Sequence, residues 1–117
     1  MQTALWIAQG VLALLFLMSG SMKLVTPKPA LTEKLPVLAS FAPATIKLIG
    51  LLEVLGAVGV VVPALIGVLP WLTVWAAVGL ALTMIGAAVA HGRRGEWPQI
   101  GVNAVLFGLA VFVALGR

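Results

Sequence analysis

The chain has 117 residues, of which 62% are hydrophobic and only 9% are charged. A soluble domain has about a quarter of its residues charged, and a domain this small cannot bury so much apolar surface. The composition therefore excludes an ordinary soluble fold and predicts a protein whose solvent is lipid.

The formal net charge is +4, and the sequence contains no Cys. Without Cys, the chain can form no disulfide, hold no iron–sulfur cluster through its own thiolates and carry out no thiol chemistry. Basic residues in a soluble protein would suggest nucleic acid, but beside long apolar runs they act as topology signals. No nucleic-acid partner is therefore expected.

The first apolar run covers residues 4–25. It ends at residues 26–29, Thr-Pro-Lys-Pro, because two prolines cannot continue a helix. The run is not preceded by the basic segment that a cleaved signal peptide needs. Residues 26–42 form the longest connection, in which residues 30–35 are expected to make a short helix at the membrane interface.

The second span is expected at residues 43–66. It opens at Pro43, a residue suited to the first turn of a helix. Pro63 lies near its far end and is expected to kink it. A short connection centred on residues 67–70 then leads to the third span.

The third and fourth spans are expected at residues 71–91 and 99–115. A polar turn at residues 92–98 separates them, with Gly and Pro as helix breakers. Each of the four runs is close to the roughly 20 residues that a helix needs to cross the bilayer. Because the connections are short, we predict an all-α fold: a single transmembrane domain, residues 1–117, built as an antiparallel four-helix bundle.

The basic residues predict how the bundle is oriented. Six of the seven flank the first and third connections: Lys23, Lys28, Lys34, Lys47, Arg93 and Arg94. The opposite face has only Arg117 and the amino terminus. The positive-inside rule then places both connections in the cytoplasm and both termini outside.

Glu53 is the most informative polar residue, because it lies about ten residues, or roughly 15 Å, into the second span. An acidic side chain at that depth costs about 3 kcal/mol unless it is partnered or protonated. Its neighbours one turn away are Gly50, Gly56 and Ala57. A face of small residues allows another helix to approach closely, so Glu53 is expected to point into the bundle.

Three further polar residues lie in the same half of the membrane. Lys23, near the inner end of the first span, either extends to the headgroups or turns inward and pairs with Glu53. His91 ends the third span, where a lone His is most often an interfacial hydrogen-bonding group or a favourable charge at the helix C-terminus. One His without Cys or Asp cannot build a zinc site, and haem ligation would need a second copy of the chain. Asn103, in the fourth span, is expected to hydrogen-bond to another helix.

Each span thus brings one polar group to the cytoplasmic half: Lys23, Glu53, His91 and Asn103. This convergence is more specific than any one of the residues. Two interpretations fit it equally well, a ligand-binding site and a polar network that holds the helices together.

Several segments in their order along the chain resemble the DoxX-like family of bacterial membrane proteins. They are FLMSGSMKL at residues 16–24, GLLEVLGA at residues 50–57 and GAAVAHGRRGE at residues 86–96, together with a closing span that ends in Gly116 and Arg117. The resemblance implies a four-helix bundle in the bacterial cytoplasmic membrane, with Lys23, Glu53 and His91 at recurrent polar positions. It also implies an association with membrane redox metabolism, because the family takes its name from a subunit of a thiosulfate:quinone oxidoreductase.

Two functions follow as hypotheses. In the first, the bundle binds a lipophilic small molecule, a quinone or a lipid, at the polar cluster. In the second, the chain is a structural or assembly subunit that recruits a membrane or redox partner protein, or a second copy of itself. An enzyme acting alone is not expected, because the sequence offers no nucleophile–base pair, phosphate-binding loop or metal constellation.

Overall fold

A computed structural model of the chain describes residues 1–67, 69 and 71–117. The described part is built from helices, with no strand within these ranges. In chain order the elements are α1 (Gln2–Val25), α2 (Lys28–Lys34), the 3₁₀ turn η1 (Pro36–Ser40), α3 (Pro43–Gly59), α4 (Val62–Ile66), α5 (Trp71–Arg93) and α6 (Trp97–Gly116).

Within the described ranges, four segments are long and apolar enough to cross a membrane: Gln2–Val25, Pro43–Ile66, Trp71–Arg93 and Trp97–Gly116. The all-α fold class of a membrane helix bundle predicted from the sequence is therefore confirmed. A helix satisfies all its backbone groups within one segment, which is why apolar runs of this length become helices in lipid. The observed first and fourth helices begin two residues earlier than expected, at Gln2 and Trp97, and the third continues to Arg93.

The second span is broken rather than smooth. Helix α3 ends at Gly59 and α4 begins at Val62, with Pro63 in its first turn. Proline has no backbone N–H and clashes with the carbonyl four residues before it, so the predicted kink takes the form of a break. Gly67 ends α4 with a φ of 70°, a left-handed conformation that glycine adopts without strain. Positions 68 and 70 of the predicted connection lie outside the described residues.

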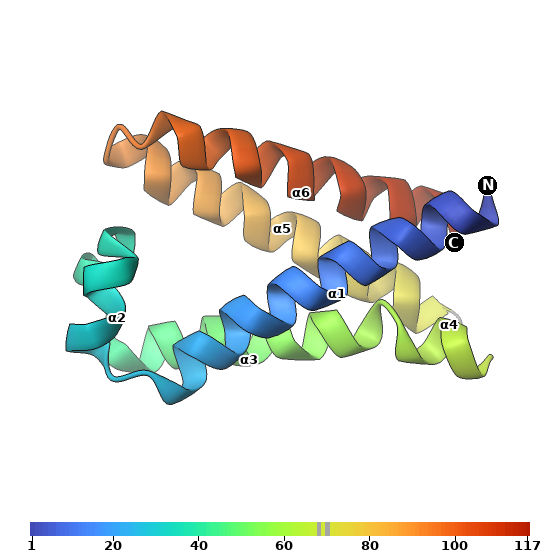
Figure 1. Cartoon of the computed structure of the whole chain (residues 1–117), viewed down its shortest axis with the longest axis horizontal. Coiled ribbons are helices and arrows are strands. Elements are labelled where there is room, and N and C mark those ends of the chain that lie inside the picture. Colours follow the sequence, from blue (N-terminus) through green and yellow to red (C-terminus); the bar gives the residue numbers. More distant parts are fainter. Residues whose placement is uncertain (68, 70) are drawn as a thin grey trace.

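The four spans form two packed pairs, α1 with α3 and α5 with α6. The pairs are joined by contacts of α1 with α6 and of α3 with α5. Figure 1 shows both termini at one end of the bundle, together with α4. At the other end, which we call the α2 end, lie α2 and the turn between α5 and α6 (Figure 1).

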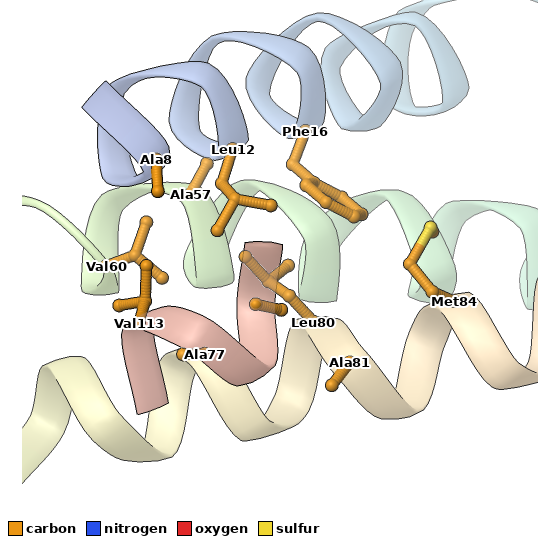
Figure 2. Packing of buried hydrophobic residues seen from close by; sticks show 11 residues of the cluster. Ala8, Leu12, Phe16, Ala57, Val60, Ala77, Leu80, Ala81, Met84 and Val113 are labelled. Carbon is orange, nitrogen blue, oxygen red and sulfur yellow. The ribbon is translucent and has the colours of Figure 1, made fainter. Parts of the chain in front are cut away.

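The main apolar core lies where all four spans meet. Figure 2 shows Leu12 and Phe16 of α1 beside Leu80 of α5, with Val60 and Val113 at the far side of the cluster. These side chains are at most 2% exposed. A second, smaller core at the α2 end is built from Leu31, Leu38 and Ile46.

Two glycines bring α1 and α3 into close contact at the α2 end. A Cβ atom added to Gly20 would lie 2.6 Å from the carbonyl oxygen of Gly50, and one added to Gly50 would lie 2.8 Å from the Cβ of Lys23. Only glycine leaves room for backbones this close. The stem of Lys23 therefore crosses directly over α3.

Candidate functional site

Lys23 and Glu53 form a buried ion pair between α1 and α3. The ammonium Nζ lies 2.5 Å from Glu53 Oε1 and also donates to Ser19 Oγ at 2.7 Å. The Lys23 side chain is 11% exposed and that of Glu53 is 3% exposed. Lys23 therefore turns inward and pairs with Glu53, rather than extending to the headgroups. The close approach at Gly20 and Gly50 explains it, because Lys23 and Glu53 each lie one helical turn from that contact.

His91 belongs to a second polar group, at the turn between α5 and α6. Its Nδ1 lies 2.9 Å from Glu96 Oε1, and Arg94 Nε lies 3.5 Å from the same oxygen. Gly95, with a φ of 71°, turns the chain so that the backbone N–H of Glu96 reaches the carbonyl of His91. An ionised carboxylate only accepts hydrogen bonds, so a neutral imidazole here carries its proton on Nδ1 and leaves Nε2 as an acceptor.

Glu96 was not among the residues selected from the sequence. It lies in the polar turn five residues after His91, and a carboxylate in a turn is usually solvated. The available signal was Gly95, since a residue in the left-handed conformation reverses the chain within a few positions.

Asn103 is 7% exposed, and its side chain has no hydrogen-bond partner among the residues that the structure describes. The hydrogen bond to another helix expected from the sequence is therefore not found in this part of the chain. The amide instead borders a cavity. A side-chain amide carries two donors and one acceptor oxygen, so Asn103 offers that cavity an unused hydrogen-bonding group.

The cavity has a volume of about 590 Å³ and lies between the two helix pairs at the α2 end. All four polar residues predicted from the sequence border it. Its apolar walls come from α3, α5, α6 and the connection after α1: Leu35, Leu38, Phe41, Ile49, Met84, Ala87, Ala90, Val102 and Leu106. Cavities that bind small molecules have volumes of roughly 300–1,000 Å³ and combine apolar walls with a few directed polar groups.

The connection between α1 and α3 contributes more to this cavity than the sequence suggested. The predicted short helix at residues 30–35 corresponds to α2, and its Leu31 is fully buried. Leu35, Leu38 and Phe41 then line the cavity from the side of η1. Their spacing of three residues matches a 3₁₀ turn, in which residues three apart lie on one face.

A separate polar cluster closes the opposite end of the bundle. Gln9 is fully buried, and its Nε2 donates to the carbonyl of Val60 at 2.5 Å. Its Oε1 accepts from Arg117 Nε at 2.8 Å, and the Arg117 guanidinium lies 4.7 Å from the centre of the Trp6 ring. Val60 lies at the break in the second span, so Gln9 binds a carbonyl that the interrupted helix leaves available.

No group of three or more His, Cys, Asp or Glu residues that could hold a metal ion occurs among the described residues.

A comparison with families of known sequence matches residues 7–113 to the DoxX-like family. The matched region contains Lys23, Glu53, His91 and Asn103 and reaches into all four spans. No curated protein and no solved structure matches the chain at a significant level.

Proposed function

The chain belongs to the DoxX-like family, and we propose that it is a membrane protein that binds a lipophilic small molecule in the cavity at the α2 end. The observation that carries this proposal is the cavity itself. About 590 Å³ of space lies beside Lys23, Glu53, His91 and Asn103, and apolar side chains form the remaining walls.

The distribution of groups suits an amphiphilic ligand. Its polar head would lie near Asn103 and His91, and its apolar part would lie against residues such as Met84 and Leu106. A quinone and a lipid both have this form. A quinone would connect the site to membrane redox metabolism, the association that the family resemblance implies.

We also propose that the α2 end faces the cytoplasm of a bacterial cell and that both termini lie outside its inner membrane. The support is the position of the charges. Lys28, Lys34, Lys47, Arg93 and Arg94 all belong to elements at the α2 end. Cytoplasmic connections carry such an excess of Lys and Arg.

The second candidate function is a structural or assembly subunit, which would hold a redox or other membrane partner, or a second copy. One observation favours it: Lys23, Glu53 and His91 already have partners within the protein, as residues that lock helix packing would. The unused amide of Asn103 and the open cavity favour the binding function.

The test is native mass spectrometry of the purified protein, with identification of bound lipids and quinones. Ala87→Phe places a ring in the cavity, and Val89→Phe places the same ring on an exposed face of α5. We expect a lipophilic molecule to remain bound to the wild type and to Val89→Phe and to be lost from Ala87→Phe.

A second pair of variants tests the polar group. Glu53→Gln changes the ion pair at the cavity, whereas Glu33→Gln makes the same change on the exposed surface of α2. Equal retention in the wild type, Ala87→Phe and Glu53→Gln would contradict ligand binding at this site. Recovery of a partner protein that Glu53→Gln releases would instead support the assembly function.

A further inference from the structure

The charged groups beside the cavity are paired within the protein. Lys23 and Glu53 neutralise each other at 2.5 Å, and this pair has no net charge wherever the shared proton lies. At the turn between α5 and α6, Glu96 forms an ion pair with Arg94 and accepts a hydrogen bond from His91. With a neutral imidazole, this second group also has no net charge. Among the described residues that border the cavity, Lys23, Glu53 and a neutral His91 therefore present no unpaired charge to a molecule inside it.

The cavity does offer an uncharged hydrogen-bonding group. Asn103 is only 7% exposed, and within the described ranges its amide has no hydrogen-bond partner. The amide borders the cavity, and its atoms are not among the fully enclosed, unbonded polar atoms of the described residues. A ligand in the cavity can therefore form hydrogen bonds with the amide.

The rim of the cavity lies within the membrane-spanning part of α6. Val102 is 60% exposed and Gln99 is also exposed, yet both border the cavity. Val102 lies within a span, so its exposed surface faces lipid. The α2 end is covered by Leu35 and Leu38, which pack into the small core there. We therefore expect a ligand to enter from the bilayer, beside Gln99 and Val102 of α6.

From these three observations we infer that the occupant is a membrane-resident amphiphile with an uncharged, hydrogen-bonding head that binds Asn103. This inference rests on the proposed function and names its ligand class. A phosphate or carboxylate head would lose its hydration inside the cavity without meeting a free cation. The exposed Arg93 and Lys47 do not line the cavity. They can attract anionic headgroups only at the membrane surface.

The test uses two probes that differ only by a phosphate. The protein is placed in nanodiscs of phosphatidylcholine and labelled with a photoreactive monoacylglycerol, and the labelled residues are mapped by mass spectrometry. Unlabelled monoacylglycerol and the lysophosphatidic acid with the same acyl chain then compete for the site. We expect labelling of cavity residues and competition by monoacylglycerol at about tenfold lower concentration, the ratio that one desolvated hydrogen bond or charge produces.

Asn103→Leu should lower the labelling of the cavity by about tenfold, because leucine has a similar size and no hydrogen-bonding group. The control is Val105→Leu, which changes a side chain of α6 that is 64% exposed and does not border the cavity. Thermal unfolding of both variants shows whether Asn103→Leu still folds. Labelling is compared only at temperatures well below both transitions.

The outcomes separate the two proposals. Equal or stronger competition by lysophosphatidic acid overturns the uncharged head while leaving a binding cavity in place. Unchanged labelling in Asn103→Leu overturns the role of Asn103. If the photoreactive monoacylglycerol labels only lipid-facing residues in the wild type and in every variant, the cavity binds no such ligand, and the proposed function itself fails.

Discussion

Replacing Lys23 by Met should destabilise the bundle more than replacing Glu53 by Met. Each change removes one partner of the ion pair between α1 and α3, whose atoms Nζ and Oε1 are 2.5 Å apart. The two variants differ in whether the charged side chain that remains can reach the lipid headgroups. Lys23 lies two residues before the end of α1, so its long side chain can extend to the headgroups when Glu53 is lost. The short Glu53 side chain, 3% exposed, has no such route.

The magnitudes follow from this difference. Removing one partner of a buried pair costs about 3–5 kcal/mol, because an uncompensated charge stays in the interior. Lys23→Met should therefore cost about 4 kcal/mol, and Glu53→Met about half as much, since Lys23 can reach the headgroups. The double variant replaces the pair by apolar side chains and should lie within about 1–2 kcal/mol of the wild type.

The assay is equilibrium unfolding in mixed micelles with increasing dodecyl sulfate. Circular dichroism follows the helices, and the fluorescence of the four tryptophans follows tertiary packing. The matched controls are Lys34→Met and Glu33→Met, which make the same chemical changes at exposed positions of α2. Each control should change the free energy of unfolding by less than about 0.5 kcal/mol.

Additive losses in the free energy of unfolding would contradict a coupled ion pair. If the losses of the two single variants sum in the double variant, the residues do not interact, and the ion pair is not a unit of the folded protein. A larger loss for Glu53→Met than for Lys23→Met would contradict the argument that Lys23 alone can escape to the headgroups.

Three further predictions concern other parts of the chain. Gln9→Leu should cost about 1–3 kcal/mol in the free energy of unfolding, because it removes the donor to the Val60 carbonyl at the break in the second span. Gly20→Val should cost about 1–3 kcal/mol or prevent folding, because its Cβ would lie 2.6 Å from the Gly50 carbonyl oxygen. Because the chain has no Cys, Glu33→Cys introduces a single thiol. If the α2 end faces the cytoplasm, this thiol should react with a membrane-impermeant maleimide only after cells are opened.

Each of these has a matched control. Gly10→Val adds the same side chain to α1 at a position with no atom within 4 Å, and an equal loss there would mean that the close approach of α1 and α3 is not the cause. Gln2→Leu removes only an exposed hydrogen bond from Arg117 and should leave stability nearly unchanged. Leu115→Cys, 84% exposed near the other end of the bundle, should react in intact cells, and the reverse pattern would invert the proposed orientation.

The helices themselves could be predicted closely from the sequence. Lipid cannot hydrogen-bond to the backbone, so an apolar run of sufficient length has one outcome, a helix. Proline then decides the boundaries: Pro43 opens α3, and Pro63 breaks the span that it interrupts. Membership of the DoxX-like family was also recognisable, because Lys23, Glu53 and His91 appear in order within segments typical of it.

The partners of the polar residues could be predicted only in part. Pairing of Lys23 with Glu53 was one of two interpretations, and the contact at Gly20 and Gly50 decides between them. The partner of His91, Glu96, depends on the path of a turn. That no described side chain or carbonyl bonds to the amide of Asn103 depends on the positions of all its neighbours.

Hydropathy is enough to identify the four apolar segments and the polar groups that they carry, because it depends on each residue's own side chain. The cavity between the two helix pairs at the α2 end, and the place of Asn103 on its wall, arise only from tertiary packing. Those features depend on the rotation and tilt of each helix against its neighbours. Rotation and tilt follow from the fit of many side chains at once, among them the glycines at which α1 and α3 touch.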